Sequence, residues 1–400
     1  MGSSPMVNTN HARARRVRVR ACATALAAAA AVLPVGPAAA ADTITAADQS
    51  YYAYYHLDQA RAKGYTGKGV TIAVLDGEVD ASAPELAGAT VTDKTPCTVT
   101  SSLRSKSHGT AMASLLVSKN YGVAPDARLL SYRTSFSSAG DESGSDCIGT
   151  NGVGAVSPTS LINHAINDGA QIISVSSSNT QTTKSLKWAV ARANARGVII
   201  VSPSGNDATD ETIDSFGKWS GVVSVSAIDT NGKRAEYSSW GRGVTTAAVG
   251  GPMLARNYET GNNDPTNGTS NSTPLVAGFL ALARQKWPDA TSNQILQVLT
   301  HTGLSDQSGW NKYTGYGAVD AGALVNTDPS QYPDENPLAD KGGETSPTPA
   351  EVQQYADGLV APTEIAYDDS YAYRGTDESY LANTDVANPI HIGTSPRYHR

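Results

Sequence analysis

Short apolar runs alternate with segments of helical periodicity between about residues 67 and 320. The runs are rich in valine and isoleucine and apolar throughout, a pattern typical of strands buried on both faces of a parallel sheet; they lie at residues 70–75, 129–132, 172–176, 198–201 and 222–225. Other segments have the spacing and end signals of helices, namely residues 110–118, 160–167, 183–195, 273–287 and 292–300. This alternation predicts an α/β sandwich, with ligands bound at the carboxyl ends of the strands.

The first forty residues have a different pattern. Five arginines between Arg13 and Arg20 precede an apolar run over residues 21–35, and small residues follow as far as Ala41. A basic segment, a short apolar run and small residues at a cleavage site are the features of a secretory signal peptide, and the run is short for a membrane span. We therefore expect residues 1–41 to be a signal peptide, residues 42–66 to lead into the main domain, and the mature protein to be secreted, extracellular and without a stable membrane span.

The composition changes again after about residue 327. Residues 328–400 carry 13 acidic and four basic residues, seven of the 18 tyrosines, several prolines and few aliphatic side chains. Such a segment buries little apolar surface, which favours disorder. We expect a main domain at residues 67–327 followed by a disordered, acidic, tyrosine-rich tail at residues 328–400, with a small tyrosine-rich β appendage as the alternative.

Charge and cysteine content exclude two kinds of site. The chain has 37 acidic and 30 basic residues, a net charge of −7 without a basic stripe, which argues against binding to nucleic acid. Removal of the signal peptide leaves Cys97 and Cys147 as the only cysteines. In an exported chain they are expected to form a disulfide, with two free thiols as the alternative. Two cysteines with no neighbouring histidine cluster exclude a thiolate zinc site.

Three segments place a reactive side chain where an α/β fold exposes it. Asp76 follows the apolar run of residues 70–75, at the carboxyl end of a predicted strand. His108 begins a predicted helix of small residues, and Ser270 lies at the mouth of another helix, in which Pro274 suits only the first turn. A serine hydroxyl needs a base to take its proton, a histidine suits that work near neutral pH, and a buried carboxylate orients the histidine.

The motifs around these residues resemble those of the subtilisin family (subtilases) of serine endopeptidases. They are GKGVTIAVLD ending at Asp76, SHGT around His108, GVAPDA at residues 122–127, GN ending at Asn206, GTS ending at Ser270 and GYGAVDA at residues 315–321. The order Asp, His, Ser along the chain is that of subtilisin, and the G-x-S-x-G motif of lipases is absent at Ser270.

This resemblance implies a subtilisin-like three-layer sandwich with a mostly parallel central sheet, polypeptide substrates and a monomeric enzyme. It implies that Asp76 orients the base, that His108 is the general base, that Ser270 is the nucleophile and that Asn206 stabilises the oxyanion. It also implies that small side chains border the substrate pocket, namely Ser176, Ser177, Ser178, Ser204 and Gly205. The chemistry needs no cofactor. Structural calcium is common in the family, but no D-x-D-x-D-G loop is present, so no metal ligands are assigned.

Some residues depart from the family pattern. Glu78 adds an acid near the histidine, which is expected to raise the pKa of His108, and Asn271 with Ser272 suggests a more polar floor to the active site. About 34 residues separate the expected cleavage site from Asp76, too few for the folding prodomain common in secreted members. Two alternatives stay open: a pseudoprotease that binds peptides without turnover, and a processing enzyme dedicated to one exported partner that docks on the acidic tail.

Overall fold

A computed structural model describes residues 43–134, 140–149, 153–176, 183–210, 216–306, 308–342, 346–377 and 391–392. The predicted signal peptide lies outside the described residues. No helix in these ranges is long and apolar enough to cross a membrane.

The central sheet has seven strands in the order β2-β4-β1-β6-β7-β8-β9, and every pairing between neighbours is parallel. The strands are β1 Thr71–Asp76, β2 Thr90–Asp93, β4 Arg128–Arg133, β6 Ile172–Val175, β7 Ile199–Pro203, β8 Val222–Ile228 and β9 Val244–Val249. The five predicted runs correspond to β1, β4, β6, β7 and β8, so the expectation of a mostly parallel sheet is confirmed. The edge strands β2 and β9 are not among the predicted strands, because they contain several threonines and alanines and no continuous aliphatic run.

The helices are α1 Ser50–Tyr54, α2 Leu57–Ala62, α3 Leu103–Val117, α4 Pro158–Asn167, α5 Lys184–Ala195, α6 Thr269–Lys286, α7 Ser292–His301, α8 Ala321–Asn326 and α9 Pro349–Ala356. Two short antiparallel ladders lie outside the sheet, one between β3 Val99–Thr100 and β5 Glu142–Ser143 and one between β10 Met253–Arg256 and β11 Asn263–Thr266. A parallel pair joins β12 Ala372–Tyr373 to β13 His391–Ile392.

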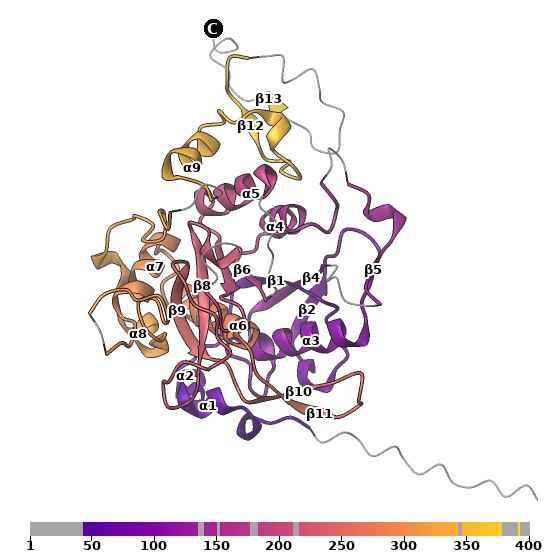
Figure 1. Ribbon diagram of the computed structural model, residues 1–400, viewed down its shortest axis with the longest axis vertical. Coiled ribbons are helices and arrows are strands. Elements are labelled where there is room, and N and C mark those ends of the chain that lie inside the picture. The colour runs from indigo at the N-terminus through magenta and orange to yellow at the C-terminus, as the bar shows by residue number, and fades with distance from the viewer. Residues whose placement is uncertain are drawn as a thin grey trace, which may run out of the picture. The chain divides into compact units, whose positions relative to one another are not determined.

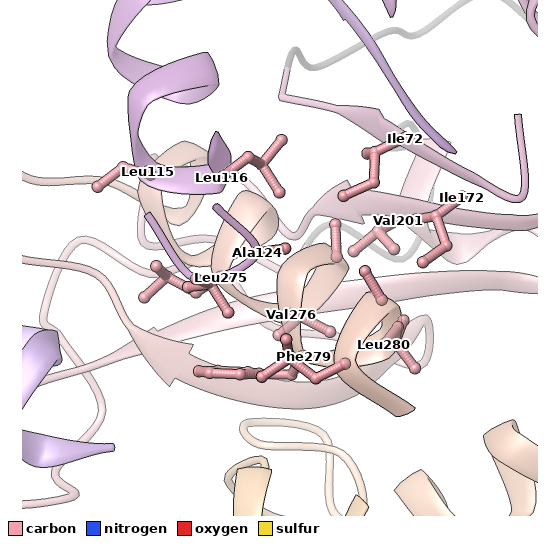
Figure 2. Packing of buried hydrophobic residues seen from close by; sticks show 14 of the residues in the cluster. Ile72, Leu115, Leu116, Ala124, Ile172, Val201, Leu275, Val276, Phe279 and Leu280 are labelled. Atoms are coloured by element: carbon pink, nitrogen blue, oxygen red, sulfur yellow. The ribbon is translucent and has the colours of Figure 1, made fainter. Parts of the chain in front are cut away.

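Side chains that alternate along the strands supply two cores, one on each face of the sheet. Ile72 of β1 packs on the face covered by α3 and α6, and the next residue, Ala73, packs on the face covered by α4 and α5 (Figure 1). Helices thus cover both faces, which confirms the three-layer sandwich. Figure 2 shows the larger core, where side chains of α3, α6 and the strands meet, with labelled side chains Ile72, Leu115, Leu116, Ala124, Ile172, Val201, Leu275, Val276, Phe279 and Leu280.

The N-terminal lead-in is an integral part of this fold. Ile44 and Tyr51 are buried in the larger core, and the Tyr51 hydroxyl donates to the carbonyl of Tyr121 at 2.8 Å. The Arg61 guanidinium of α2 donates to the carbonyls of Lys119 and Gly122, each at 2.6 Å. Residues before the first strand therefore hold the turn that follows α3.

A disulfide between Cys97 and Cys147 fastens an insertion that lies between β4 and α4. The insertion supplies β5, which pairs with β3, and the carboxylate of Asp141, which accepts hydrogen bonds from the Ser102 backbone at 2.7 Å and the Ser105 hydroxyl at 2.8 Å. Since Ser102 is the N-cap of α3, the insertion holds the first turn of that helix. The predicted disulfide is present.

Residues 328–342 are also folded, against the expectation of disorder. Leu338 is buried in the larger core, and the Lys341 ammonium donates to three backbone carbonyls, those of Gly217 at 3.0 Å, Val222 at 2.5 Å and Gly243 at 2.6 Å. Burial lowers the pKa of Lys341 to about 7. The buried amino group of Lys341 therefore ties this segment to the end of the sheet.

The expectation of a disordered tail is also wrong for residues 346–377, here called the C-terminal appendage. Its helix α9 lies beside α5, as Figure 1 shows, and its apolar residues form a third cluster with the outer side of α5. This cluster contains Trp188, Ala191, Tyr355, Val360, Ile365, Tyr371 and Tyr373. The segment has few aliphatic residues, but it folds because α5 offers apolar surface for its tyrosines. The predicted tail residues 378–390 and 393–400 lie outside the described residues.

Candidate active site

The carboxylate of Asp76 is buried at the carboxyl end of β1, the place that the sequence pattern predicts. The residue is fully inaccessible to solvent. Its Oδ1 accepts a hydrogen bond from the backbone N–H of Gly77 at 2.7 Å and lies 2.7 Å from Nδ1 of His108. A charge this deeply buried needs partners, and here they fix the orientation of an imidazole.

His108 lies in the second turn of α3 and not at the start of a helix as predicted. The helix begins earlier, at Leu103, because the hydroxyl of Ser102 caps it by accepting from the Ser105 N–H at 3.2 Å. The side chain of His108 is 36% exposed. Burial lowers the pKa of His108, but the charge and hydrogen bond of Asp76 outweigh this effect and the opposing charge of Arg104, so the pKa is raised overall.

Ser270 is the second residue of α6, which confirms its predicted place at the mouth of a helix. Its hydroxyl donates to the carbonyl of Ser176, at the end of β6, at 3.0 Å. The helix starts four residues earlier than predicted, so Pro274 lies inside it and not in its first turn. Proline has no N–H to donate to the carbonyl of residue 270, which leaves that carbonyl without its usual helical partner.

Asn206 follows β7 and reaches the same helix mouth. Its Oδ1 accepts from the backbone N–H and the hydroxyl of Thr269, at 2.8 and 2.9 Å. These two bonds determine which way the amide faces, so its Nδ2 group is turned away from Thr269. Within the described residues no hydrogen bond engages Nδ2, and Asn206 is exposed. The amide is thus a fixed N–H donor beside Ser270.

The predicted pocket residues take different positions. Ser176 and Gly205 lie at the ends of β6 and β7, next to Ser270 and Asn206. Gly205 has φ +106°, a conformation that favours glycine. Ser204 directs its hydroxyl away from the site, to the carbonyl of Ser239 at 3.0 Å, and is buried. Ser177 and Ser178 lie outside the described residues.

Glu78 does not have its expected effect on His108, and the polar side chains of Asn271 and Ser272 are bonded within the protein. The carboxylate of Glu78 is paired with Lys106 at 3.4 Å and Arg133 at 3.2 Å, and it is not among the groups that shift the pKa of His108. Asn271 donates to the carbonyl of Gly250, and Ser272 donates to that of Ala248, so both polar side chains are bonded within the protein.

A charged border beside His108 is not apparent from the sequence. Lys106 lies 3.1 Å from Asp80 and 4.7 Å from the ring centre of Tyr258. The Tyr258 hydroxyl donates to Asp80 at 2.9 Å, and its backbone N–H donates to the hydroxyl of Ser107 at 2.8 Å. Tyr258 belongs to the β10–β11 hairpin, so only the folded chain brings it here. Proximity of Lys106 to His108 in the sequence was the one available signal.

Among the described residues there is no group of three or more histidine, cysteine, aspartate or glutamate side chains placed to hold a metal ion. These parts of the chain therefore offer no set of side chains that could be assigned as calcium ligands.

Residues 67–317 match the subtilase family. The thermostable alkaline protease of Halalkalibacterium halodurans is 32% identical over 279 residues, 67% of this chain and 71% of that protein. Subtilisin BL of Lederbergia lenta is 31% identical over 275 residues, 66% of this chain and 94% of that protein.

Solved structures agree with these matches. MycP1 from the ESX-1 type VII secretion system has a TM-score of 0.60 at 26% identity, covering 74% of this chain and 90% of that one. Fervidolysin from Fervidobacterium pennivorans, described as a keratinolytic enzyme related to subtilisin, has a TM-score of 0.57 at 25% identity, covering 69% and 45%. On the family match and on these relatives, the chain belongs to the subtilase family of serine proteases.

Proposed function

We propose that the protein is a secreted serine endopeptidase that cleaves polypeptides through an acyl-enzyme at Ser270. The observation that carries this proposal is the 2.7 Å contact between His108 Nδ1 and the buried carboxylate of Asp76. A carboxylate placed in this way holds the imidazole in one tautomer and stabilises the imidazolium. The nitrogen that then serves as base is Nε2.

The reaction follows from these roles. Nε2 of His108 takes the proton of Ser270 as Oγ bonds to the carbonyl carbon of the scissile peptide, and the C=O electron pair moves onto oxygen. The tetrahedral intermediate collapses, the C–N bond breaks, and the leaving amine takes the proton from His108. A water molecule then repeats the sequence on the ester, which releases the acid and restores Ser270.

The Ser270 hydroxyl donates to the Ser176 carbonyl at 3.0 Å, which has a consequence for substrate binding. A backbone N–H of a bound peptide is a suitable donor to that same carbonyl at the end of β6. By taking this acceptor, the peptide would release the hydroxyl to turn towards His108. Substrate binding and activation of the nucleophile are coupled in this proposal.

Two donors suit the oxyanion. The Nδ2 group of Asn206 is held by the bonds that its Oδ1 makes with Thr269. The backbone N–H of Ser270 is among the first N–H groups of α6, which have no partner within the helix. Donors fixed before the charge develops stabilise the transition state, because they need no reorganisation.

Labelling with a fluorophosphonate, which reacts with an activated serine, tests the proposal. We expect label on the mature protein and none on Ser270→Ala or His108→Ala. Ser330→Ala, a change at an exposed serine far along the chain, is the matched control and should label fully. A well-folded protein that takes no label would favour the pseudoprotease. N-terminal sequencing of protein recovered from a culture supernatant tests secretion, with a new terminus expected near residue 42.

A processing role with one partner is the second candidate. MycP1, to which this chain is 26% identical, is described as an essential component of a secretion system. The C-terminal appendage is the element that a dedicated partner would contact. Digestion of a mixed peptide library distinguishes the two candidates: cleavage at many sites supports a general endopeptidase, whereas cleavage of very few peptides supports a dedicated one.

A further inference from the structure

Arg104 is a cation that the fold itself does not use. It is exposed in the first turn of α3, and no ion pair or hydrogen bond engages it within the described ranges. The two cations that share Glu78 among the described residues are both engaged: Lys106 pairs with Glu78 and Asp80, and Arg133 pairs with Glu78 and Asp93. The charge of Arg104 is therefore the uncompensated one.

The position of Arg104 in its helix is electrostatically unfavourable. The N-terminus of a helix carries partial positive charge, so it favours acidic residues and disfavours basic ones. The first turn of α3 contains no acidic residue to offset Arg104. The preceding residue, Leu103, is 54% exposed. Residues that break a local rule without a structural gain tend to mark functional positions.

Arg104 lies beside the base of the active site. It precedes His108 by four residues in α3, and residues at this spacing lie on the same face of a helix with Cβ atoms roughly 5–6 Å apart. Its positive charge acts on His108 strongly enough to lower the pKa of the imidazole in part. A peptide bound at Ser270 and His108 would therefore lie next to the face of α3 that carries the exposed Arg104.

We propose that Arg104 selects substrates with an acidic side chain close to the scissile bond, and that Leu103 supplies an apolar contact next to that side chain. This proposal rests on the proposed function, because it places the substrate at Ser270. It names the substrate class: segments in which aspartate or glutamate flanks the cleavage point. Arg104 is a specificity residue and takes no part in the bond-breaking steps.

The strength of ion pairs on a protein surface sets the size of the expected preference for acidic peptides. An accessible guanidinium and carboxylate interact weakly in water, so we expect the acidic peptide to exceed its neutral analogue roughly two- to fivefold in kcat/KM at low salt. The ratio should fall as ionic strength rises, because the screening length is roughly 8 Å at 0.15 M. Salt dependence separates a charge effect from a change in pocket shape.

The test compares peptides that differ at one position, with Glu, Gln or Lys placed in turn at each of the three positions on either side of the cleaved bond. The mature chain, Arg104→Gln and Arg104→Glu are assayed with each peptide. We expect the preference for Glu to disappear in the first variant and to turn into a preference for Lys in the second. Lys63→Gln, which removes an exposed cation at the end of α2, should keep the wild-type ratio.

A pH profile with the neutral peptide gives an independent readout. Asp76 raises the pKa of His108 and Arg104 lowers it, whereas Glu78 is paired with Lys106 and Arg133. Arg104→Gln should therefore move the acid limb of kcat/KM to higher pH. An unchanged Glu-to-Gln ratio in Arg104→Gln, or no preference at any of the six positions in the wild type, would overturn the proposal.

Binding to the Ser270→Ala variant separates the two proposals. Fluorescence anisotropy of labelled Glu and Gln peptides is measured with Ser270→Ala and with the double variant that adds Arg104→Gln. Tighter binding of the Glu peptide that disappears in the double variant supports the role of Arg104 even for a chain that hydrolyses nothing. Hydrolysis with equal binding and equal rates for both peptides supports the proposed function and rejects this inference.

Discussion

Asp368→Ala removes one half of the buried ion pair that holds the C-terminal appendage on α5. The Asp368 carboxylate lies 2.9 Å from Nη2 of Arg192, with side-chain exposures of 1% and 3%. It also accepts from the backbone N–H of Ser370 at 3.0 Å, from the Ser370 hydroxyl at 2.7 Å and from the hydroxyl of Tyr355. The substitution leaves the guanidinium buried without its counter-charge.

The other contacts of Arg192 set the size of the loss. Removing one partner of a buried pair costs about 3–5 kcal/mol, because the remaining charge stays desolvated. Arg192 keeps the Oδ1 atoms of Asn163 at 2.9 Å and Asn167 at 2.6 Å as acceptors. We therefore expect the lower end, about 3 kcal/mol, in the free energy that holds the appendage on α5.

Hydrogen exchange of the α9 amides measures this free energy locally. A loss of about 3 kcal/mol raises the exchange rate roughly 100-fold, since each 1.4 kcal/mol is a factor of ten. Amides of β1 and β6 should change far less, because the larger cores do not include the appendage. Asp357→Ala, at an exposed acid in the same appendage, is the control and should change the rates less than threefold.

Two results would refute this reasoning. One is an Asp368→Ala protein with α9 exchange rates equal to those of the control, since the ion pair would then contribute nothing to docking. The other is a double variant, Arg192→Met with Asp368→Leu, that is as unstable as Asp368→Ala. A pair replaced by apolar residues of similar volume removes the stranded charge, so the double variant should regain part of the loss, while Tyr355, Ser370, Asn163 and Asn167 lose hydrogen-bond partners.

Three further predictions concern other parts of the chain. Replacing Cys97 and Cys147 with serine should lower the free energy of unfolding by about 4 kcal/mol, the loop-entropy value for a separation of 50 residues, in chemical denaturation without reductant; a loss below 1 kcal/mol would contradict it. Asn206→Ala should reduce kcat about 10²–10³-fold with little change in KM, and an unchanged kcat would exclude its oxyanion role. The pKa of Lys341 is about 7 in the folded chain and 10.5 ordinarily, so between these pH values the unfolded chain binds one proton more than the folded chain. The free energy of unfolding should therefore rise between pH 7 and 10.5 in chemical denaturation. Lys341→Met should lack this rise, and equal slopes of free energy against pH in the two proteins would refute the prediction.

The sequence predicts the positions of Asp76, His108 and Ser270 because each lies in a short motif at the end of a strand or near the start of a helix. The interpretation of His108 fails in one detail. The cap at Ser102 depends on Asp141, which holds it from a distant insertion, and nothing in the local pattern indicates that α3 begins there. Local patterns thus identify the chemistry better than they place the helix boundaries.

The C-terminal appendage shows why the rest could not be predicted. Its apolar residues, among them Val360, Ile365 and Tyr371, follow neither a helical nor a strand period. They form a core only because Trp188 and Ala191 face outward from α5. The charged border beside His108 could not be predicted for the same reason, because Tyr258 and Lys106 are far apart in the sequence and only the fold brings them together. The composition of a segment indicates how much apolar surface it can bury by itself. It does not indicate how much apolar surface another segment offers for it to pack against.

Helix α5 is apolar on two opposite sides, and this feature constrains how the family can vary. One side packs on the sheet through Leu186 and Val190, and the other packs on the appendage through Trp188 and Ala191. A descendant that lost the appendage would expose the second side to water, so the loss should be accompanied by polar substitutions at positions 188 and 191. The gain of a C-terminal extension and the composition of an internal helix should therefore be inherited together, as covarying positions.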